Sequence, residues 1–223
     1  MRMNIAIDGP SAAGKSTIAK RLSKILHYSH LDTGAMYRCV AYAFKQRNIN
    51  ADDEEAVSAM MNDLNIHFDE DGKVFLNQKD VSLAIRTNDM SMLASKVSAY
   101  PQVRKGLVDL QRSIAANKGY ILDGRDIGSV VLPDAEVKIY MVATAQARAQ
   151  RRYDEYIAKG IEANYEEILK DIEQRDYQDM NRAVSPLKKC DDAIEIDTSN
   201  LTIEEVCEQI MAIINKAKEG VDA

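Results

Sequence analysis

The feature that most constrains the fold is a short glycine-containing loop near the start of the chain. The segment "DGPSAAGKST" occupies residues 8–17 and has the spacing Gly-x-x-x-x-Gly-Lys-Ser. This spacing is typical of a phosphate-binding loop (P-loop), whose backbone N–H groups converge on phosphate oxygens at the beginning of a helix. The apolar run at residues 5–7 predicts a buried strand before the loop, and apolar residues at helical spacing follow it. Because both flanks are those a P-loop requires, the sequence predicts binding of a nucleoside triphosphate.

Several side chains in and beyond the loop have expected roles. Lys15 is expected to reach the β- and γ-phosphates, and the Ser16 hydroxyl to bind Mg²⁺. Asp8 and Asp123 each follow a predicted strand, from which a carboxylate can reach Mg²⁺ directly or through water. Asp8 can equally be a cap of the P-loop turn. The predicted metal-binding residues are Ser16 and Asp123, and the predicted ATP-binding residues are Gly9, Pro10, Ser11, Ala12, Ala13, Gly14, Lys15, Ser16 and Thr17.

Apolar segments alternate with helical patterns along most of the chain. Near-continuous apolar runs are expected of parallel strands buried on both faces. The sequence therefore predicts an α/β fold, a doubly wound five-stranded parallel sheet with helices on both faces. The predicted strands are 4–7, 30–32, 119–124, 136–143 and 192–197. The predicted helices are 15–27, 33–46, 54–64, 101–118, an arginine-rich region at 145–181, and a last helix with a capping box at Thr202–Glu205 and an apolar stripe of Ile203, Val206, Ile210 and Ile213.

One stretch breaks the alternation of strands and helices. Ile66 and Phe68, then Val74 and Leu76, alternate with polar residues around Asp71-Gly72. This pattern predicts a β-hairpin whose turn needs a positive φ. We therefore expect a small inserted subdomain at about residues 62–88.

The composition limits the possible partners. The chain has 223 residues and a net charge of −6, so we expect no binding to nucleic acid or to an anionic membrane. No apolar stretch approaches the roughly 20 residues that span a bilayer. The three cysteines are widely spaced and match no metal-ligand pattern, which favours reduced packing residues in a cytoplasmic protein. No helix shows a second apolar stripe, so a monomer is expected.

Three classes of P-loop protein fit the loop itself. A GTPase switch needs an Asn-Lys-x-Asp motif, and "NKAKE" near the end of the chain lacks the aspartate. A motor or helicase normally has a longer chain. A small-molecule kinase needs a second anion site, and arginines at predicted ligand edges can form one: Arg38, Arg125, the set Arg148, Arg151 and Arg152, and the pair Arg175 and Arg182.

Other polar residues have plainer interpretations. Asp32 before Thr33 can be a helix cap. The three histidines have no neighbours in the sequence at catalytic spacing and are interpreted as structural or surface residues: His27, His30 and His67.

Several longer motifs together resemble the bacterial cytidylate kinase family of nucleoside monophosphate kinases. They are "IAIDGPSAAGKST", "LDTGAMYR", "SKVSAYPQVR", "LDGRDIGSVVLPDAEVKIY", "RRYDEY" and "QRDYQDMNRAVSPL", which extend from residue 5 to about residue 197. The resemblance implies a single P-loop kinase domain over 1–223, with a monophosphate-binding region at about 33–104 and a lid at about 148–165. It also implies an Mg²⁺-dependent reaction of ATP with CMP or dCMP.

The resemblance further implies roles for individual residues. Thr33, Arg38 and Arg125 would hold the CMP phosphate, while Ser95, Arg104 and Asp126 would bind the cytosine. Arg175 and Asp179 would lie near the ribose, and Arg182 would contact phosphate. The catalytic set is Lys15, Arg125, Arg148, Arg152 and Arg182. One departure is that Gln178 and Met180 stand where related sequences often carry arginines.

Two alternatives stay open on these residues. One is a monophosphate kinase that acts on AMP or UMP, since only the base-binding residues separate it from a CMP kinase. The other is a regulatory switch that binds ATP or GTP without transferring phosphate.

Overall fold

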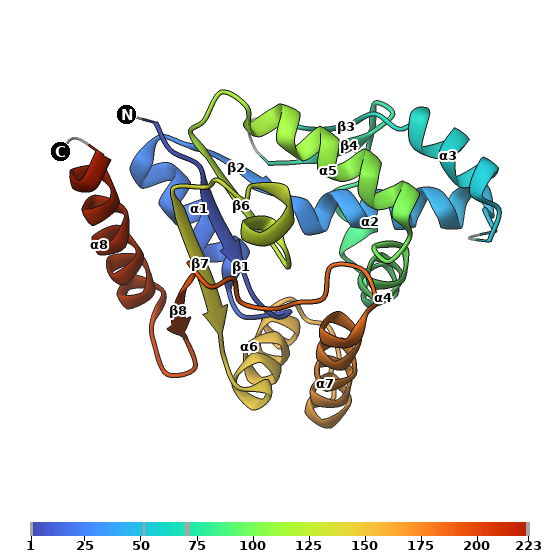
Figure 1. Cartoon of the computed structure of the whole chain (residues 1–223). Coiled ribbons are helices and arrows are strands. Elements are labelled where there is room, and N and C mark those ends of the chain that lie inside the picture. Colours follow the sequence, from blue (N-terminus) through green and yellow to red (C-terminus); the bar gives the residue numbers. More distant parts are fainter. Residues whose placement is uncertain (1, 51, 70–71, 222–223) are drawn as a thin grey trace. The chain divides into compact units, whose positions relative to one another are not determined.

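The structure is a computed structural model that describes residues 2–50, 52–69 and 72–221 (Figure 1). Two compact units divide the chain. The first, here called the P-loop unit, contains the residues up to Leu31 and those from Ala115 onward, and the second, the central unit, contains Asp32–Ile114. Each unit is described by itself.

The main sheet has five strands in the order β2-β6-β1-β7-β8. Strand β1 pairs in parallel with β6 and β7, and β7 pairs in parallel with β8, so the predicted five-stranded parallel sheet is confirmed. Asp8 at the end of β1 lies opposite Gly124 of β6. The P-loop and the segment after β6 therefore begin at the same edge of the sheet. The strands are β1 Ile5–Asp8, β2 Ser29–Asp32, β6 Tyr120–Gly124, β7 Val137–Val142 and β8 Ile194–Asp197.

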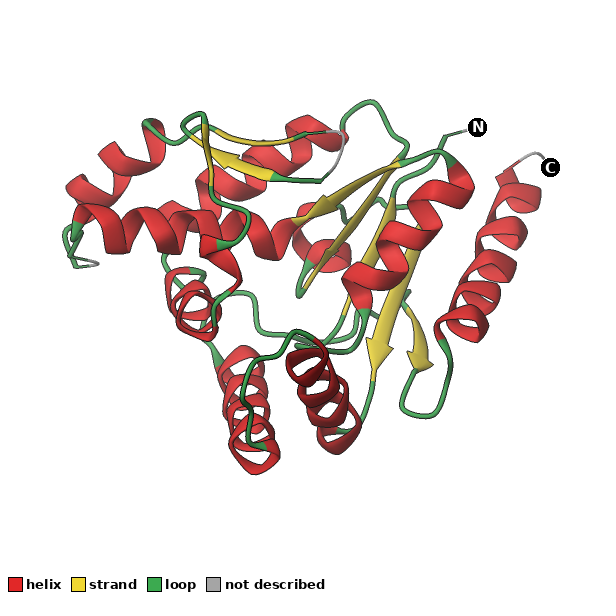
Figure 2. Cartoon of the chain, turned by 180° about the vertical axis from the view of Figure 1, so that it is seen from behind, coloured by secondary structure: helices red, strands yellow, loops and turns green. Residues whose placement is uncertain are grey.

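Two helices of the P-loop unit cover one face of this sheet. Helices α1 (Lys15–Leu26) and α8 (Ile203–Val221) contact each other, and α1 contacts β1 and β6 while α8 contacts β7. Their buried side chains share a core with every second residue of the strands, such as Ile5, Ile7 and Ile139. The opposite face contacts a π-helical turn, η2 (Ile127–Val131). Beyond the carboxyl end of β7, α6 (Ala145–Ala158) and α7 (Tyr165–Asn181) pack against each other (Figures 1 and 2).

The central unit is mostly helical and contains a second, smaller sheet. Its helices are α2 Thr33–Arg47, α3 Glu54–Asn62, the 3₁₀ turn η1 Ala84–Arg86, α4 Asn88–Val97 and α5 Pro101–Ala115. Its strands are β3 Ile66–Phe68, β4 Val74–Leu76 and β5 Lys79–Asp80, in the order β3-β4-β5. β3 and β4 are antiparallel, which confirms the predicted hairpin. Gly72 has the expected positive φ, and Asp71 lies outside the described residues.

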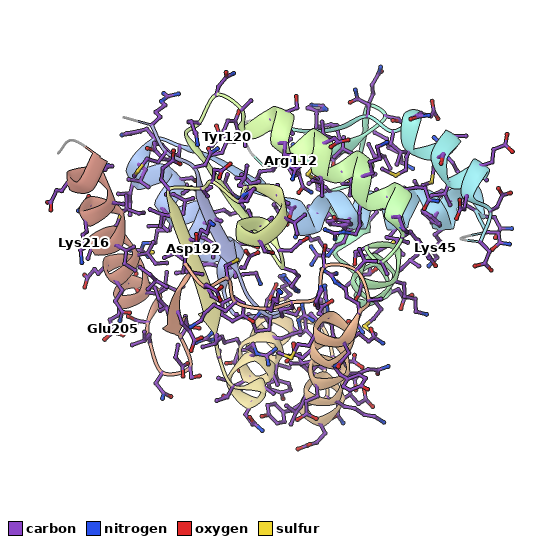
Figure 3. The ribbon with its side chains drawn as sticks, in the orientation of Figure 1. Lys45, Arg112, Tyr120, Asp192, Glu205 and Lys216 are labelled. Carbon is purple, nitrogen blue, oxygen red and sulfur yellow. The ribbon has the colours of Figure 1, made fainter. Side chains whose placement is uncertain are left out.

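Some local expectations hold and others do not. Thr202 and Glu205 form the predicted capping box, with Glu205 at the beginning of α8 (Figure 3). The predicted stripe of α8 is wrong at Ile203, which is 43% exposed, and the buried stripe is Val206, Cys207, Ile210 and Ile214. Helix α4 was not predicted, and the predicted arginine-rich helical region forms two helices, α6 and α7. In the described part of the chain, no helix has the length and apolar character needed to cross a membrane.

Candidate functional site

The P-loop backbone has a conformation that its glycines make possible. Gly9 and Gly14 have φ values of 147° and 90°, and Ala12 between them has a φ of 60°. A Cβ on Gly9 would lie 2.1 Å from the carbonyl oxygen of Met141 in β7. A side chain is therefore excluded where the loop leaves β1, and left-handed residues of this kind are typical of an anion-binding nest.

Lys15 is held inside this loop. It is 6% exposed, and its Nζ donates a hydrogen bond to the carbonyl oxygen of Pro10 over 2.6 Å. Burial, and then the positive charge of Arg125 with a smaller contribution from Arg175, holds the pKa of Lys15 well below its usual value. Three cationic groups therefore face one region of the P-loop unit, and a bound anion would relieve their repulsion.

The predicted metal-binding residues are adjacent. The Ser16 hydroxyl donates to Asp123 Oδ2 over 2.7 Å, and Asp123 is 4% exposed. A hydroxyl and a carboxylate are hard oxygen ligands of the kind Mg²⁺ takes together with substrate phosphates. The pair therefore fits an Mg²⁺ ion carried with a nucleotide.

Asp8 makes hydrogen bonds to a turn that the sequence did not indicate. Its two carboxylate oxygens accept hydrogen bonds from the N–H groups of Ile127 and Gly128, both over 2.8 Å. Asp8 thus ties β1 to the η2 turn, immediately after Asp126. Burial raises the pKa of Asp8 to about 6, although the two backbone hydrogen bonds oppose that rise.

Several of the predicted phosphate-binding arginines gather around one carboxylate. Asp179 of α7 is 2% exposed and accepts a hydrogen bond from Arg125 Nε over 2.8 Å, while Arg175 Nε lies 3.8 Å from the same oxygen. Burial opposes the ionisation of Asp179, but Arg125 and Arg175, helped by Arg182, hold its pKa below the usual value. Asp123 and Asp176 also act on Arg125, so these arginines lie among several carboxylates.

The two predicted lid arginines lie in different surroundings. Arg148 is 4% exposed: it makes a bidentate ion pair with Asp176, and its Nη1 also donates to the Ser11 carbonyl oxygen over 3.1 Å. Arg148 thus links α6, α7 and the P-loop. Arg152, one turn further along α6, is half-buried and makes no hydrogen bond or ion pair with the described part of the chain. The catalytic roles of both residues stay predictions.

The predicted residues of the central unit lie on its helices α2, α4 and α5. Thr33 and Arg38 are on α2, where Asp32 caps the helix by accepting from the Ala35 N–H over 2.8 Å. Burial raises the pKa of Asp32, but Arg86 and Arg38 outweigh that effect and lower it. Arg86 Nη2 donates a hydrogen bond to Asp32 Oδ2 over 2.9 Å. Arg86 was not singled out from the sequence.

The predicted base-binding residues divide between the two units. Arg104 of α5 is 5% exposed and donates to the Tyr37 hydroxyl over 3.4 Å, and Ser95 is half-buried on α4, a helix that contacts α2. Asp126 belongs to the P-loop unit and is 5% exposed. Its carbonyl oxygen accepts from the N–H groups of Val130 and Val131, so the η2 turn fixes its backbone.

One histidine has a partner that the sequence did not indicate. His30 Nε2 lies 2.6 Å from Asp123 Oδ1, so His30 has a partner within the predicted metal site. The contact joins residues 93 positions apart in neighbouring strands, and no local sequence signal reports it. The other two histidines are as predicted, since His27 ends α1 and His67 stacks on Phe75.

Comparisons with known proteins agree with this geometry. A sequence model of the family described as cytidylate kinase matches residues 5–216. The chain is 47% identical over 220 residues to the cytidylate kinase of Carboxydothermus hydrogenoformans, covering 97% of this chain and 99% of that protein. It is 49% identical over 218 residues to the cytidylate kinase of Ligilactobacillus salivarius, covering 96% and 97%.

Solved structures agree at the level of the fold. A shikimate kinase from Bacteroides thetaiotaomicron aligns with a TM-score of 0.50 at 11% identity, covering 96% of this chain and 99% of that one. An uncharacterised protein from Eubacterium ventriosum aligns with a TM-score of 0.54 at 12% identity, covering 97% and 99%. These likenesses, with the sheet order, confirm an α/β P-loop kinase fold.

Proposed function

Because the chain belongs to the cytidylate kinase family, we propose that it transfers the γ-phosphoryl group of ATP to CMP and dCMP, forming CDP and dCDP. The observation that carries the proposal is the set of cations around Lys15. Arg125 and Arg175 both depress its pKa, and together with Arg182 they lower the pKa of Asp179. Two phosphate groups, one on the donor and one on the acceptor, are ligands that such a cluster of cationic side chains suits.

The donor side of the reaction uses the P-loop. The loop backbone, Gly9 to Thr17, would hold the ATP phosphates, and Lys15 would exchange its Pro10 carbonyl partner for phosphate oxygens. Ser16 and Asp123 would hold Mg²⁺, which supplies neutralisation of phosphate charge when bound. Arg148 and Arg152 would stabilise negative charge on the transferring group.

The acceptor side needs both an anion site and a base site. Thr33, Arg38 and Arg125 would bind the CMP phosphate, and Arg175, Asp179 and Arg182 would bind the ribose and phosphate. For cytosine, Asp126 accepts from the N4 amino group, while Arg104 and Ser95 bond to the ring acceptors. Uracil would place its O4 acceptor against the Asp126 carboxylate, and the two acceptors would repel each other.

The chemistry needs positioning and charge more than acid–base groups. A phosphate oxygen of CMP forms a bond to the γ-phosphorus of ATP as the bond between that phosphorus and the bridging β–γ oxygen breaks, so that the leaving electrons go to ADP. The attacking oxygen is already anionic, so no residue has to remove a proton. The arginines and Lys15 act by holding the two phosphates in line and by stabilising charge spread over the equatorial oxygens.

The proposed partners of the protein are the nucleotides ATP, CMP and dCMP alone. A net charge of −6 disfavours nucleic acid and anionic membranes as partners, and we propose a monomer that acts in the cytoplasm.

The proposal is tested by following the label from ATP radiolabelled at the γ-phosphate. With CMP present, the label should move into CDP rather than into inorganic phosphate. Lys15→Met should lower the rate by at least ~10²-fold, since it removes a transition-state contact. Lys20→Met, an exposed position on the same helix, is the matched control and should keep the wild-type rate. Nucleotide binding without labelled CDP would favour the regulatory switch instead.

A further inference from the structure

The Asp123 carboxylate is held from two sides. Its Oδ2 accepts from the Ser16 hydroxyl over 2.7 Å, and its Oδ1 lies 2.6 Å from His30 Nε2. The His30 and Asp123 side chains are 11% and 6% exposed. Ser16 and Asp123 belong to the predicted metal site, whereas His30 has no role in the function proposed so far.

The contact is built into the sheet. Strand β2, which carries His30, is the neighbour of β6, which carries Asp123. Ile121 packs in the core shared with α1, and Asp123, two residues further, points to the same face of the sheet. Ser16 lies in the first turn of α1 on that face. Backbone positions, rather than mobile surface side chains, therefore bring the three groups together.

The arrangement restrains how the carboxylate is presented. A carboxylate turns about its terminal torsion unless both oxygens are engaged, because that torsion is broad. A ring N–H of His30 on Oδ1 fixes the carboxylate plane and leaves Oδ2 directed at Ser16. Hydrogen bonds of this kind, from a group that does not itself touch the metal, set ligand orientation and affect metal affinity.

We propose that His30 is a positioning residue, which orients the Asp123 carboxylate for the Mg²⁺ that accompanies ATP. The inference rests on the proposed function, because it takes the Mg²⁺ site from it. It concerns only metal binding in the presence of nucleotide and needs no CMP and no turnover. A purely structural His30 would fill space between β2 and α1, and its replacement by another side chain of similar size would leave metal affinity unchanged.

The experiment measures Mn²⁺ binding, since Mn²⁺ prefers oxygen ligands as Mg²⁺ does and its free concentration is read from its electron paramagnetic resonance signal. The enzyme is saturated with β,γ-methylene ATP, which is not hydrolysed, and titrated with Mn²⁺. His30→Leu should weaken Mn²⁺ binding ~10-fold or more, the range found when a supporting hydrogen bond to a metal ligand is removed. His30→Gln, whose amide can donate at nearly the position of Nε2, should restore most of the affinity.

The controls separate orientation from packing. His67→Leu replaces an exposed histidine in the central unit and should bind Mn²⁺ as the wild type does. If His30→Leu does not fold, His30→Asn takes its place, since its shorter amide stays polar but does not reach Asp123. Equal Mn²⁺ affinity in the wild type and a folded His30→Leu or His30→Asn would overturn the proposal, as would a His30→Gln as weak as His30→Leu. If Mn²⁺ binding is weakened in His30→Leu and recovers in His30→Gln, but the wild type does not phosphorylate CMP, the proposed function is rejected and the role of His30 stands.

Discussion

Arg125 and the buried Asp179 form an ion pair, with Nε donating to Oδ2 over 2.8 Å between the end of β6 and α7. Their side chains are 18% and 3% exposed. The pair joins a residue predicted from its position at a strand end to one implied by the family resemblance. It also sets the orientation of a guanidinium group that the proposed mechanism places on phosphate.

Asp179→Asn is expected to lower both stability and activity. Loss of the carboxylate leaves Arg125 and Arg175 without their shared charge partner, and breaking a buried pair typically costs on the order of 3 kcal/mol. We expect a loss of that size in urea unfolding and at least a ~10-fold fall in kcat/KM for CMP. Glu173→Gln, an exposed carboxylate on the same helix, should stay within about 0.5 kcal/mol of the wild type. A matching loss in both variants would contradict a specific role for Asp179.

Gly9→Ala is expected to disable the P-loop. The new Cβ would lie 2.1 Å from the Met141 carbonyl oxygen, and backbone must move to accommodate it. Gly160→Ala is the control, because Gly160 also has a positive φ but no atom within 4 Å of a Cβ. It should cost only the ~1–2 kcal/mol of a left-handed alanine. Gly9→Ala should lower the unfolding temperature and the calorimetric affinity for ATP far more than Gly160→Ala does. Similar decreases in the two variants would refute the steric argument.

The raised pKa of Asp8 implies that the stability of the protein depends on pH. Its pKa of about 6 in the folded chain exceeds the usual 3.8, so the folded state holds the proton more tightly than the unfolded state does. The stabilising contribution is complete below about pH 4 and is lost as the pH rises through 6. The difference between a pKa of 3.8 and one of about 6 corresponds to on the order of 3 kcal/mol of stability.

The measurement compares urea unfolding of the wild type and Asp8→Asn from pH 4 to pH 7.5. All other titratable groups are common to the two proteins, so their contributions cancel in the difference between the two free energies of unfolding. The wild type should therefore lose stability relative to Asp8→Asn as the pH rises from about 4 to about 6. A difference that does not change with pH would show that burial does not raise the pKa of Asp8.

Arg38→Ala should affect acceptor binding selectively. Arg38 lies on α2 near Asp32, where its charge lowers the pKa of that carboxyl group. If Arg38 binds the CMP phosphate, the KM for CMP should rise by ~10-fold or more while the KM for ATP stays close to that of the wild type. Arg47→Ala, on the same helix and paired with the exposed Asp63, should leave both constants unchanged. An unaltered KM for CMP in Arg38→Ala would remove this residue from the acceptor site.

Local patterns predicted most of the P-loop unit. The loop spacing, the apolar strands and the capping box of α8 are each contained within a few neighbouring residues, so a sequence displays them. The α8 stripe was wrong at Ile203 because the first turn of a helix can stand clear of the core, as its 43% exposure shows. Helix α4 was missed although Met90, Ser91, Ala94 and Val97 are buried at helical spacing, because two of these four residues are a serine and an alanine rather than large apolar residues.

The site shows the same division between local and tertiary signals. Ser16 was found from the P-loop spacing, and Arg125 from its position after a strand. The partners of the polar groups come from tertiary structure: Asp176 on Arg148, Arg86 on Asp32, and the η2 N–H groups on Asp8. The partner of His30 was not foreseen for this reason, since the pairing order of β2 and β6 brings this histidine to Asp123.

The most direct test of cytosine-selective phosphoryl transfer is the kcat/KM for CMP, dCMP, UMP and AMP with Mg-ATP, measured by coupled ADP release for the wild type and Asp126→Asn. We predict rapid turnover of CMP and dCMP, slower turnover of UMP and little of AMP. Asp126→Asn should narrow the preference for CMP over UMP by ~10-fold or more, since an amide can donate to the O4 of uracil. AMP or UMP as the better wild-type acceptor, or a CMP preference that Asp126→Asn leaves intact, would contradict this assignment of the base site.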